Sequence, residues 1–238
     1  MSLQLTSDLL PRVEETREQN IPKILFFDMC EIKQRFDMNI QNIEKQFTVA
    51  NDLIQQGKMA EAKMIWRSQI AFLDSAVDFY MHELTQYGLM KIYKNERKKT
   101  EKYNNIQVKM NIVEDALKNI TDSSWFEQFV NSLYSETTLM SFDSIKQQLN
   151  LLDLSLKDVS DIAYYKLGDT EKTGKHLKRR INDLFKRRNE IVHQADRSLK
   201  NAKENDITES VVKEYIADVK AIVMAIQIVV LEKENHTK

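Results

Sequence analysis

Residues 184–197 contain the side chains whose types and spacing best fit catalysis. Arg188 stands five positions before His193, and Asn189 lies about one helical turn before that histidine. A guanidinium neutralises phosphate oxygens through paired hydrogen bonds, and an imidazole titrates near neutral pH and can move protons. The pair therefore predicts phosphodiester chemistry. A simpler interpretation stays open, in which the arginine is a solvated helix charge and the histidine a hydrogen-bonded structural residue.

The same segment resembles a known family. The run Arg-Arg-Asn-Glu-Ile-Val-His-Gln-Ala-Asp at 187–196 resembles the signature of the HEPN superfamily, Arg-x4–6-His with a polar residue, often Asn, directly after the Arg. It is similar in particular to the RiboL-PSP-type branch, in which an Asp commonly follows the His by three positions, as Asp196 does. The Ala-Val-Asp-Phe-Tyr run at 76–80 also resembles a small-apolar-acidic-aromatic run of many members.

This resemblance implies a metal-independent endoribonuclease without a cofactor, in which two protomers pack their motif helices together and line one cleft. His193 would be the general base or acid for attack of the RNA 2′-hydroxyl on the adjacent phosphate, leaving a 2′,3′-cyclic phosphate. Arg188 would stabilise the charge that develops on that phosphate, and Asn189 would orient the phosphate or the imidazole. Asp78 would be the supporting acid, with Asp74, one turn earlier, as its alternative.

The resemblance also implies roles for the side chains around the motif. Lys186, Arg187 and Arg197 would contact the phosphates of the RNA backbone, and Asp196 would support the site. Glu190 would count against catalysis if its carboxylate pointed into a site meant for anions.

The biological role implied is that of a toxin or an anti-phage defence effector, with an antitoxin or regulatory protein as a further partner. One sub-branch carries a Tyr two residues after the His, which a nucleotidyltransferase antitoxin modifies; this chain has Ala195 there, so we do not expect that pairing. Two other functions stay open. A non-catalytic HEPN-type module would bind RNA or a nucleotide on a basic surface around Arg188, and a helical adaptor would expose an apolar stripe on its hairpin.

The elements that position these residues are expected to be helices. Four Gly and two Pro among 238 residues argue against sheet-rich enzyme folds, whose tight corners depend on these residue types. Apolar residues recur at helical spacing from near Pro22 and again over 60–93, with Cys30 and Phe72 among them, which predicts a long antiparallel hairpin over 22–93. The polar stretch 95–102 is typical of an exposed linker.

We therefore expect one all-α domain over residues 1–238, a HEPN-like helical bundle with a long N-terminal hairpin. Residues 104–238 would form the remaining helices, including a basic motif helix over 172–195. The final helix would be capped by Asp206 together with Glu209.

The formal net charge of −1 hides an uneven distribution. Residues 171–200 hold ten Lys and Arg against four Asp and Glu, a balance of +6, so the other 208 residues hold 25 basic and 32 acidic side chains, a balance of −7. Two such basic helices facing each other in a dimer would suit a phosphate backbone.

The remaining composition indicates a cytoplasmic protein that does not enter a membrane. Cys30 is the only cysteine, so no intrachain disulfide and no cysteine-based zinc site are expected. The start of the chain lacks the pattern of a secretory signal, and no apolar run approaches the roughly 20 residues of a membrane span.

Overall fold

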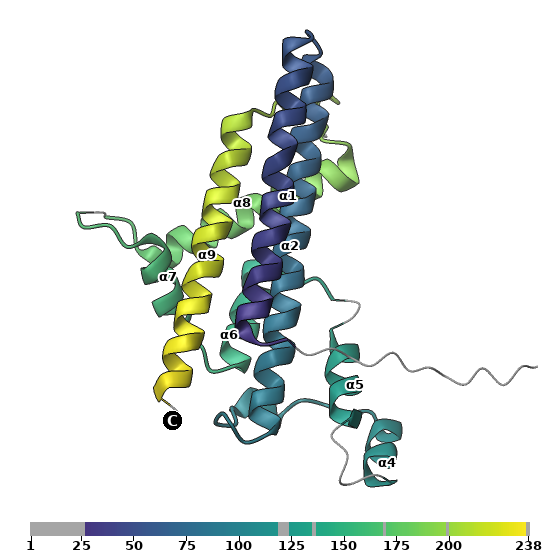
Figure 1. Ribbon diagram of the computed structural model, residues 1–238, viewed down its shortest axis with the longest axis vertical. Helices are drawn as coiled ribbons and strands as arrows, with labels where there is room; N and C mark the ends of the chain where they lie inside the picture. The colour runs from purple at the N-terminus through teal and green to yellow at the C-terminus, as the bar shows by residue number, and fades with distance from the viewer. Residues whose placement is uncertain (1–26, 119–123, 135–136, 169, 199, 237–238) are drawn as a thin grey trace, which may run out of the picture.

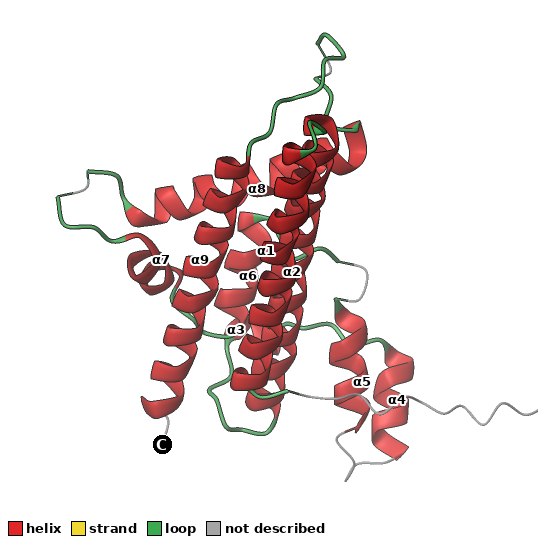
Figure 2. Ribbon diagram, turned by 45° about the horizontal axis from the view of Figure 1, so that its top comes forward, coloured by secondary structure: helices red, strands yellow, loops and turns green. Residues whose placement is uncertain are grey.

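The protein is a bundle of α-helices (Figures 1 and 2). A computed structural model describes residues 27–118, 124–134, 137–168, 170–198 and 200–236. Within these ranges the only β-type contact is an isolated antiparallel bridge between Arg197 and Glu204. The all-α prediction is therefore confirmed. The helices are, in chain order, α1 (Met29–Gln55), α2 (Met59–Tyr93), α3 (Glu101–Asn104), α4 (Met110–Lys118), α5 (Ser124–Leu133), α6 (Phe142–Leu151), α7 (Leu156–Tyr164), α8 (Thr173–Gln194) and α9 (Glu209–His236).

Helices α1 and α2 form the expected long hairpin and stand side by side along the longest dimension of the molecule (Figure 1). Asp28 caps α1, because its carboxylate accepts two backbone N–H groups of the first turn at 2.8 and 2.9 Å while Glu31 bonds back to the N–H of Asp28. The helix therefore begins just after this cap, whereas Pro22 lies outside the described residues. Gly57, with φ of +75°, supplies the left-handed turn that leads into α2.

Helical periodicity identified most of the buried stripe of the hairpin but misplaced two side chains. Leu73 and Met81 are fully buried, as expected. Phe72 is 54% exposed and Cys30 is exposed, so their predicted inward positions were wrong. Neighbouring residues of a helix point about 100° apart, so Phe72 turns to solvent when Leu73 faces the core.

The segment 95–102, expected to be an exposed linker, is partly helical and contains a buried residue. Helix α3 begins at Glu101, and Arg97 is only 5% exposed. The Arg97 guanidinium donates to Glu234 of α9 at 2.8 Å, and the hydroxyl of Tyr87 donates to the same carboxylate. The linker prediction was wrong at Arg97 because its partner lies at the far end of the sequence.

Helix α8 runs across α1, α2 and α9 rather than along them (Figure 2). Leu177, Ile181 and Leu184 form its buried face. Its first turns lie against α7, where the rings of His176 and Tyr164 stack with centroids 4.4 Å apart. The last turns of α8 lie against α2, and this places the motif beside the middle of the hairpin.

Helix α9 begins at Glu209, but Asp206 does not cap it. Thr208 precedes the helix, and its hydroxyl accepts the backbone N–H of Val211 at 3.4 Å. Asp206 instead pairs with Lys63 of α2 at 2.6 Å. The capping prediction failed because a lysine brought close by the fold binds the carboxylate.

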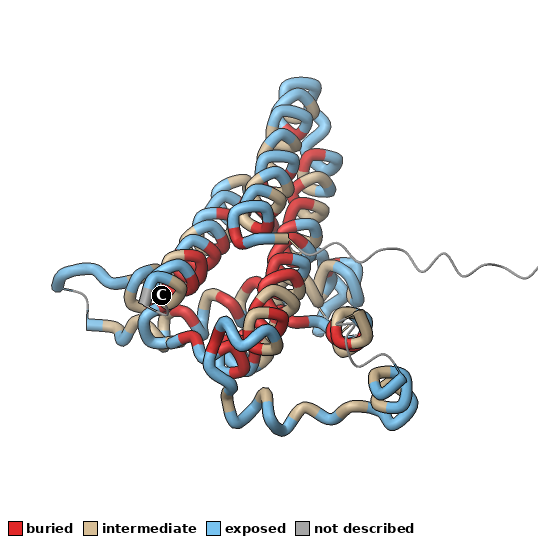
Figure 3. Tube along the Cα trace, turned by 60° about the horizontal axis from the view of Figure 1, so that its bottom comes forward, coloured by how far each residue is buried: buried red, intermediate tan, exposed pale blue. Residues whose placement is uncertain are grey.

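The buried apolar side chains of the described helices gather in one cluster inside the bundle (Figure 3). Helices α1, α2 and α9 supply most of it, and α5 to α8 pack against them. In the part of the chain that the structure describes, no helix is both long and apolar enough to cross a lipid bilayer.

The neighbours Leu73 and Phe72 allow a direct test of this packing. Leu73→Ala should lower the free energy of unfolding by about 2–5 kcal/mol, because it removes a fully buried side chain and leaves a cavity. Phe72→Ala, at an exposed position of the same helix, should cost less than about 1 kcal/mol. Urea unfolding followed by circular dichroism measures both; equal losses would contradict the helix orientation described here.

Candidate active site

The three motif residues lie together in the last turns of α8. Nη1 of Arg188 donates to Oδ1 of Asn189 at 3.0 Å and lies 3.4 Å from Nε2 of His193. A guanidinium only donates hydrogen bonds, so Nε2 is the acceptor in this contact. His193 is exposed, whereas Arg188 and Asn189 are half-buried. The long arginine side chain thus bridges the angle that separates it from the histidine on the helix.

Asp74, rather than Asp78, is the acid of α2 that contacts the motif. Its Oδ2 lies 3.1 Å from Nε of Arg188, and the residue is only 2% exposed. Asp78 instead accepts the backbone N–H of Leu139 at 2.5 Å and lies 3.8 Å from Nε2 of His82. The structure thus brings Asp74, the alternative named from the sequence, to the motif and places Asp78 against other partners, while the role of either residue as the supporting acid stays a prediction.

The carboxyl group of Asp74 is poised to change charge close to neutral pH. Burial raises the pKa of Asp74 from its ordinary value of 3.8 to about 6; Arg188 opposes this shift, and the nearby Asp78 adds to it. Its Oδ1 is buried and has no hydrogen-bond partner among the described residues. The acid beside Arg188 is therefore protonated more easily than an ordinary aspartate.

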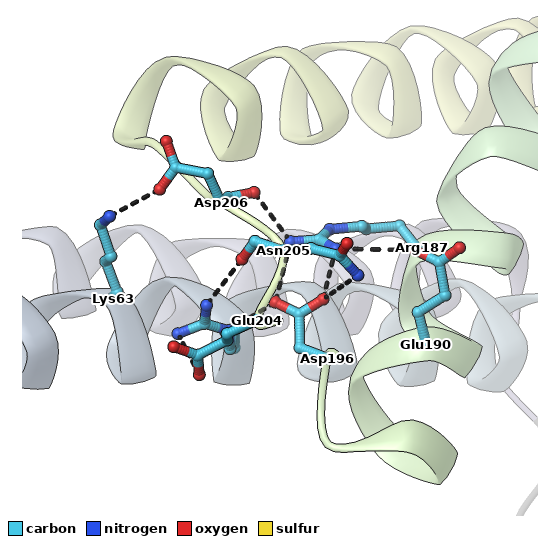
Figure 4. Close-up of polar contacts among 8 residues, drawn as sticks. Lys63, Arg187, Glu190, Asp196, Glu204, Asn205 and Asp206 are labelled. Carbon is cyan, nitrogen blue, oxygen red and sulfur yellow. Dashed lines mark hydrogen bonds and ion pairs between the residues drawn. The ribbon is translucent and has the colours of Figure 1, made fainter. Parts of the chain in front are cut away.

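Asp196 is fully buried and is the centre of a network of polar contacts (Figure 4). Its Oδ2 accepts from Nε of Arg67 at 2.5 Å and from Nη2 of Arg187 at 2.9 Å. Its Oδ1 accepts from Nη1 of Arg187 and, at 3.2 Å, from the side-chain amide of Asn205. Two cations thus compensate one buried anion. Arg67 lies on α2 and Arg187 on α8, so the network fastens the end of the motif helix to the hairpin.

The residues expected to contact RNA fall into two groups. Arg187 is only 12% exposed and is bound to Asp196, so the structure gives it a structural position rather than an accessible one. The side chain of Lys186 is 78% exposed, and Arg197 is exposed as well. Glu190 lies 3.6 Å from Arg187 and 3.9 Å from Lys186, so these cations balance its charge.

A left-handed turn directs Asp196 back toward the hairpin. Ala195 and Asp196 have φ values of 49° and 57°, and both of their N–H groups donate to the carbonyl of Glu190. This conformation is uncommon for residues other than glycine. The ion pairs of Asp196 and the hydrogen bond from the N–H of Asn205 to its carbonyl, at 2.7 Å, hold the turn in place.

The arrangement combines a cation for a phosphate with an accessible group that can move a proton. Arg188 and His193 supply these two functions from one helix end, and Asn189 orients the guanidinium. Within the described ranges, no group of three or more His, Cys, Asp or Glu side chains is placed to hold a metal ion.

Sequence reasoning missed Arg67 and Asn205, both of which support the site. Arg67 precedes Asp74 by seven positions, which places both on one face of α2 beside its apolar stripe. That spacing of opposite charges was a usable signal. Asn205 carried no such signal, because it reaches Asp196 only through the path of the loop after α8.

Comparison with known proteins identifies a family. A family model described as RiboL-PSP-HEPN matches residues 38–232, well over half of the chain. No curated protein and no solved structure matches the chain. The matched region includes α8 with the motif, Arg67 and Asp74 of α2, and the loop that carries Asp196.

The network around Asp196 should dominate the local stability. Asp196→Asn keeps a residue that tolerates the left-handed backbone but removes the buried negative charge. The two largely buried guanidinium groups are then left with their longer contacts alone, from Arg67 to Glu204 at 3.4 Å and from Arg187 to Glu190 at 3.6 Å. We expect a loss of about 3–5 kcal/mol in the free energy of unfolding. Glu204→Gln, which removes the exposed partner of Arg67, is the matched control and should cost under about 1 kcal/mol. If urea unfolding gave similar losses in the free energy of unfolding for both variants, the network around Asp196 would not stabilise the contact between α8 and the hairpin.

Asp74 should make stability depend on pH in a particular direction. The pKa of Asp74 is about 6 in the folded state and near 3.8 when unfolded, so the folded state binds more protons between these values. Stability therefore falls as pH rises through this window. When the pH is lowered from 7 to 4, the free energy of unfolding of the wild type should rise by about 2 kcal/mol relative to that of Asp74→Asn. Urea unfolding of both proteins at each pH gives the difference, and a constant or opposite difference would show that Asp74 ionises normally.

Proposed function

The chain belongs to the RiboL-PSP-HEPN family, and from this premise we propose that it is a metal-independent endoribonuclease. It would cleave RNA by attack of a ribose 2′-hydroxyl on the adjacent phosphate and leave a 2′,3′-cyclic phosphate. The observation that carries the proposal is the 3.4 Å contact between Nη1 of Arg188 and Nε2 of His193 at the exposed end of α8. A cation for phosphate and a proton acceptor thus lie within one hydrogen bond of each other.

His193 would accept the proton of the 2′-hydroxyl through Nε2, since this atom is the acceptor in the contact with Arg188. The 2′-oxygen then forms its bond to phosphorus, and the bond from phosphorus to the 5′-oxygen of the next nucleotide breaks. That leaving oxygen takes up a proton. Arg188 would balance the negative charge that develops on the non-bridging oxygens during the attack, with Asn189 holding the guanidinium in place.

A homodimer with a composite site would supply the second proton-transfer group. The attacking and leaving oxygens lie on opposite sides of phosphorus, so one imidazole cannot serve both at once. In each chain His82 contacts the carbonyl of Thr137, and His176 stacks on Tyr164, so neither lies at the motif. A second copy of His193 is the natural acid. Val192, next to it, is 48% exposed and suits a surface that a second copy covers.

For the biological role, we propose a toxin or anti-phage effector that is restrained by an antitoxin or regulatory protein. The support is chemical: an RNase with an exposed motif and no further cofactor needs restraint in its own host. Growth arrest on expression, relieved by His193→Ala, would support this role.

Cleavage assays test the activity directly. Purified protein, incubated with mixed RNAs in EDTA, should yield fragments that end in a 2′,3′-cyclic phosphate. Arg188→Ala and His193→Ala should each lower the rate by about 100-fold or more. Lys99→Ala, which removes an exposed cation beyond the end of α2, is the control and should cleave like the wild type.

Two results would contradict the proposal in different ways. RNA binding without cleavage by the wild type, or equal rates for the wild type and the motif variants, would favour a non-catalytic RNA-binding module. A wild-type protein that is strictly monomeric by light scattering, yet cleaves RNA, would retain the activity and reject the composite site.

A further inference from the structure

The cations of α8 are divided between two faces of the helix. The helix carries seven Lys and Arg against two Asp and Glu. Three of the seven point inward to carboxylates: Arg180 to Asp218, Arg187 to Asp196 and Arg188 to Asp74. The other four are all exposed: Lys175, Lys178, Arg179 and Lys186. Three of the seven cations of α8 thus pair with acids of the fold, and four remain on the outside.

The outward cations are aligned with His193. Lys175, Arg179 and Lys186 precede it by 18, 14 and seven residues, which is close to five, four and two full helical turns. They therefore lie on one face, opposite the buried Leu184, and span about 27 Å at 1.5 Å per residue. Asn182, between them, is also exposed on this face.

Several of these side chains have few competing partners. Among the described residues, Lys175 has no ion pair, and Arg179 has one half-buried carboxylate partner, Glu171, at 3.3 Å. Within the same described ranges, the ion-pair partner of Lys186 is Glu190, at 3.9 Å. Lys178 lies over the ring of Phe142 instead of pairing with an acid. A chain of phosphates would displace little to reach these cations.

The stripe ends at a hollow of about 650 Å³ between α7 and the start of α8, which lie side by side in Figure 2. Its lining includes four lysines against two carboxylates: Lys157, Lys166, Lys172 and Lys175 against Asp161 and Glu171. Tyr165 also lines it and is 68% exposed. An exposed aromatic ring among cations is a typical platform for stacking a base of single-stranded nucleic acid.

We propose that the outer face of α8 is a binding track for single-stranded RNA, which leads the strand from His193 over Lys186, Arg179 and Lys175 to a base-stacking position at Tyr165. This proposal rests on the proposed function for its substrate class, and deepens it by naming the residues that bind RNA away from the cleaved phosphate. A track of about 27 Å accommodates on the order of eight nucleotides at the 3.4 Å spacing of stacked bases.

RNA binding can be measured separately from cleavage in the full chain carrying His193→Ala. In this background, Lys175→Gln with Arg179→Gln should bind a labelled single-stranded RNA of about 20 nucleotides roughly ten-fold more weakly by fluorescence anisotropy. The slope of log affinity against log salt concentration should become shallower by about 1.4, or about 0.7 for each lost phosphate contact. The ratio of affinities for long and for four-nucleotide RNA should fall as well.

Lys98→Gln with Lys99→Gln is the matched control, since it removes two exposed cations of the loop between α2 and α3, outside the proposed track. It should leave both the affinity and the salt slope at the values of the His193→Ala background. Equal effects of the two double variants would overturn the track, because binding would then respond only to total charge.

Tyr165 provides a second, uncharged test. Tyr165→Ala should weaken binding of the long RNA by about five-fold or more, and Tyr165→Phe should restore it, because only the ring is needed for stacking. Loss of binding in both variants, or in neither, would remove the stacking position from the proposal.

The outcomes separate the two proposals. Cleavage by the wild type together with unchanged binding in the track variant retains the endoribonuclease and rejects the track. Binding that depends on the track, without cleavage by the wild type, retains the track and rejects the endoribonuclease. If the protein neither binds nor cleaves RNA, both proposals are rejected.

Discussion

The pairing of the buried Asp196 carboxylate with the guanidinium groups of Arg67 and Arg187 is the interaction on which the rest of the site depends. A carboxylate this deeply buried persists as an ion only when it is paired and hydrogen-bonded. Meeting this condition requires the left-handed turn after α8, the close approach of α8 to α2 and the return of the chain at Asn205. The end of the motif helix is therefore held from three sides, while His193, just before the turn, stays exposed.

Two adjacent arginines of α8 face acids that differ in how fully they are satisfied. Asp196, the partner of Arg187, also binds a second guanidinium and an amide, so the hydrogen-bonding capacity of this carboxylate is used within the protein. Among the described residues, Arg188 is the partner of one oxygen of Asp74, and the other oxygen has no hydrogen-bond partner. Burial raises the pKa of Asp74 to about 6, and its protonation frees Arg188 from a competing negative charge. In the proposed mechanism, the less satisfied of the two pairs, Arg188 with Asp74, is the one that receives the phosphate.

The net charge of the chain is informative only when buried and exposed charged side chains are considered separately. A net charge of −1 indicates no affinity for RNA. On α8, however, the inward arginines are neutralised by acids of the fold, and the outward cations remain exposed. In the proposed mechanism an RNA backbone would meet these outward cations and, at the cleaved phosphate, Arg188, so the potential at the surface of α8 exceeds what the whole-chain balance predicts.

The sequence by itself determined the helical class, the long hairpin and the set formed by Arg188, Asn189 and His193, because helical periodicity and a motif within one helix are local properties. Only the tertiary structure decided which acid of α2 meets the motif, and that Asp196 is a buried anchor rather than a residue lining the site. Those outcomes depend on the rotation of α2 and on contacts between residues more than a hundred positions apart. Arg97 and Asp206 follow the same logic: the sequence predicted an exposed linker residue and a helix cap, and each finds its partner only when distant parts of the chain come together. Local spacing specifies which side chains share a face, whereas the packing of helices specifies what that face meets.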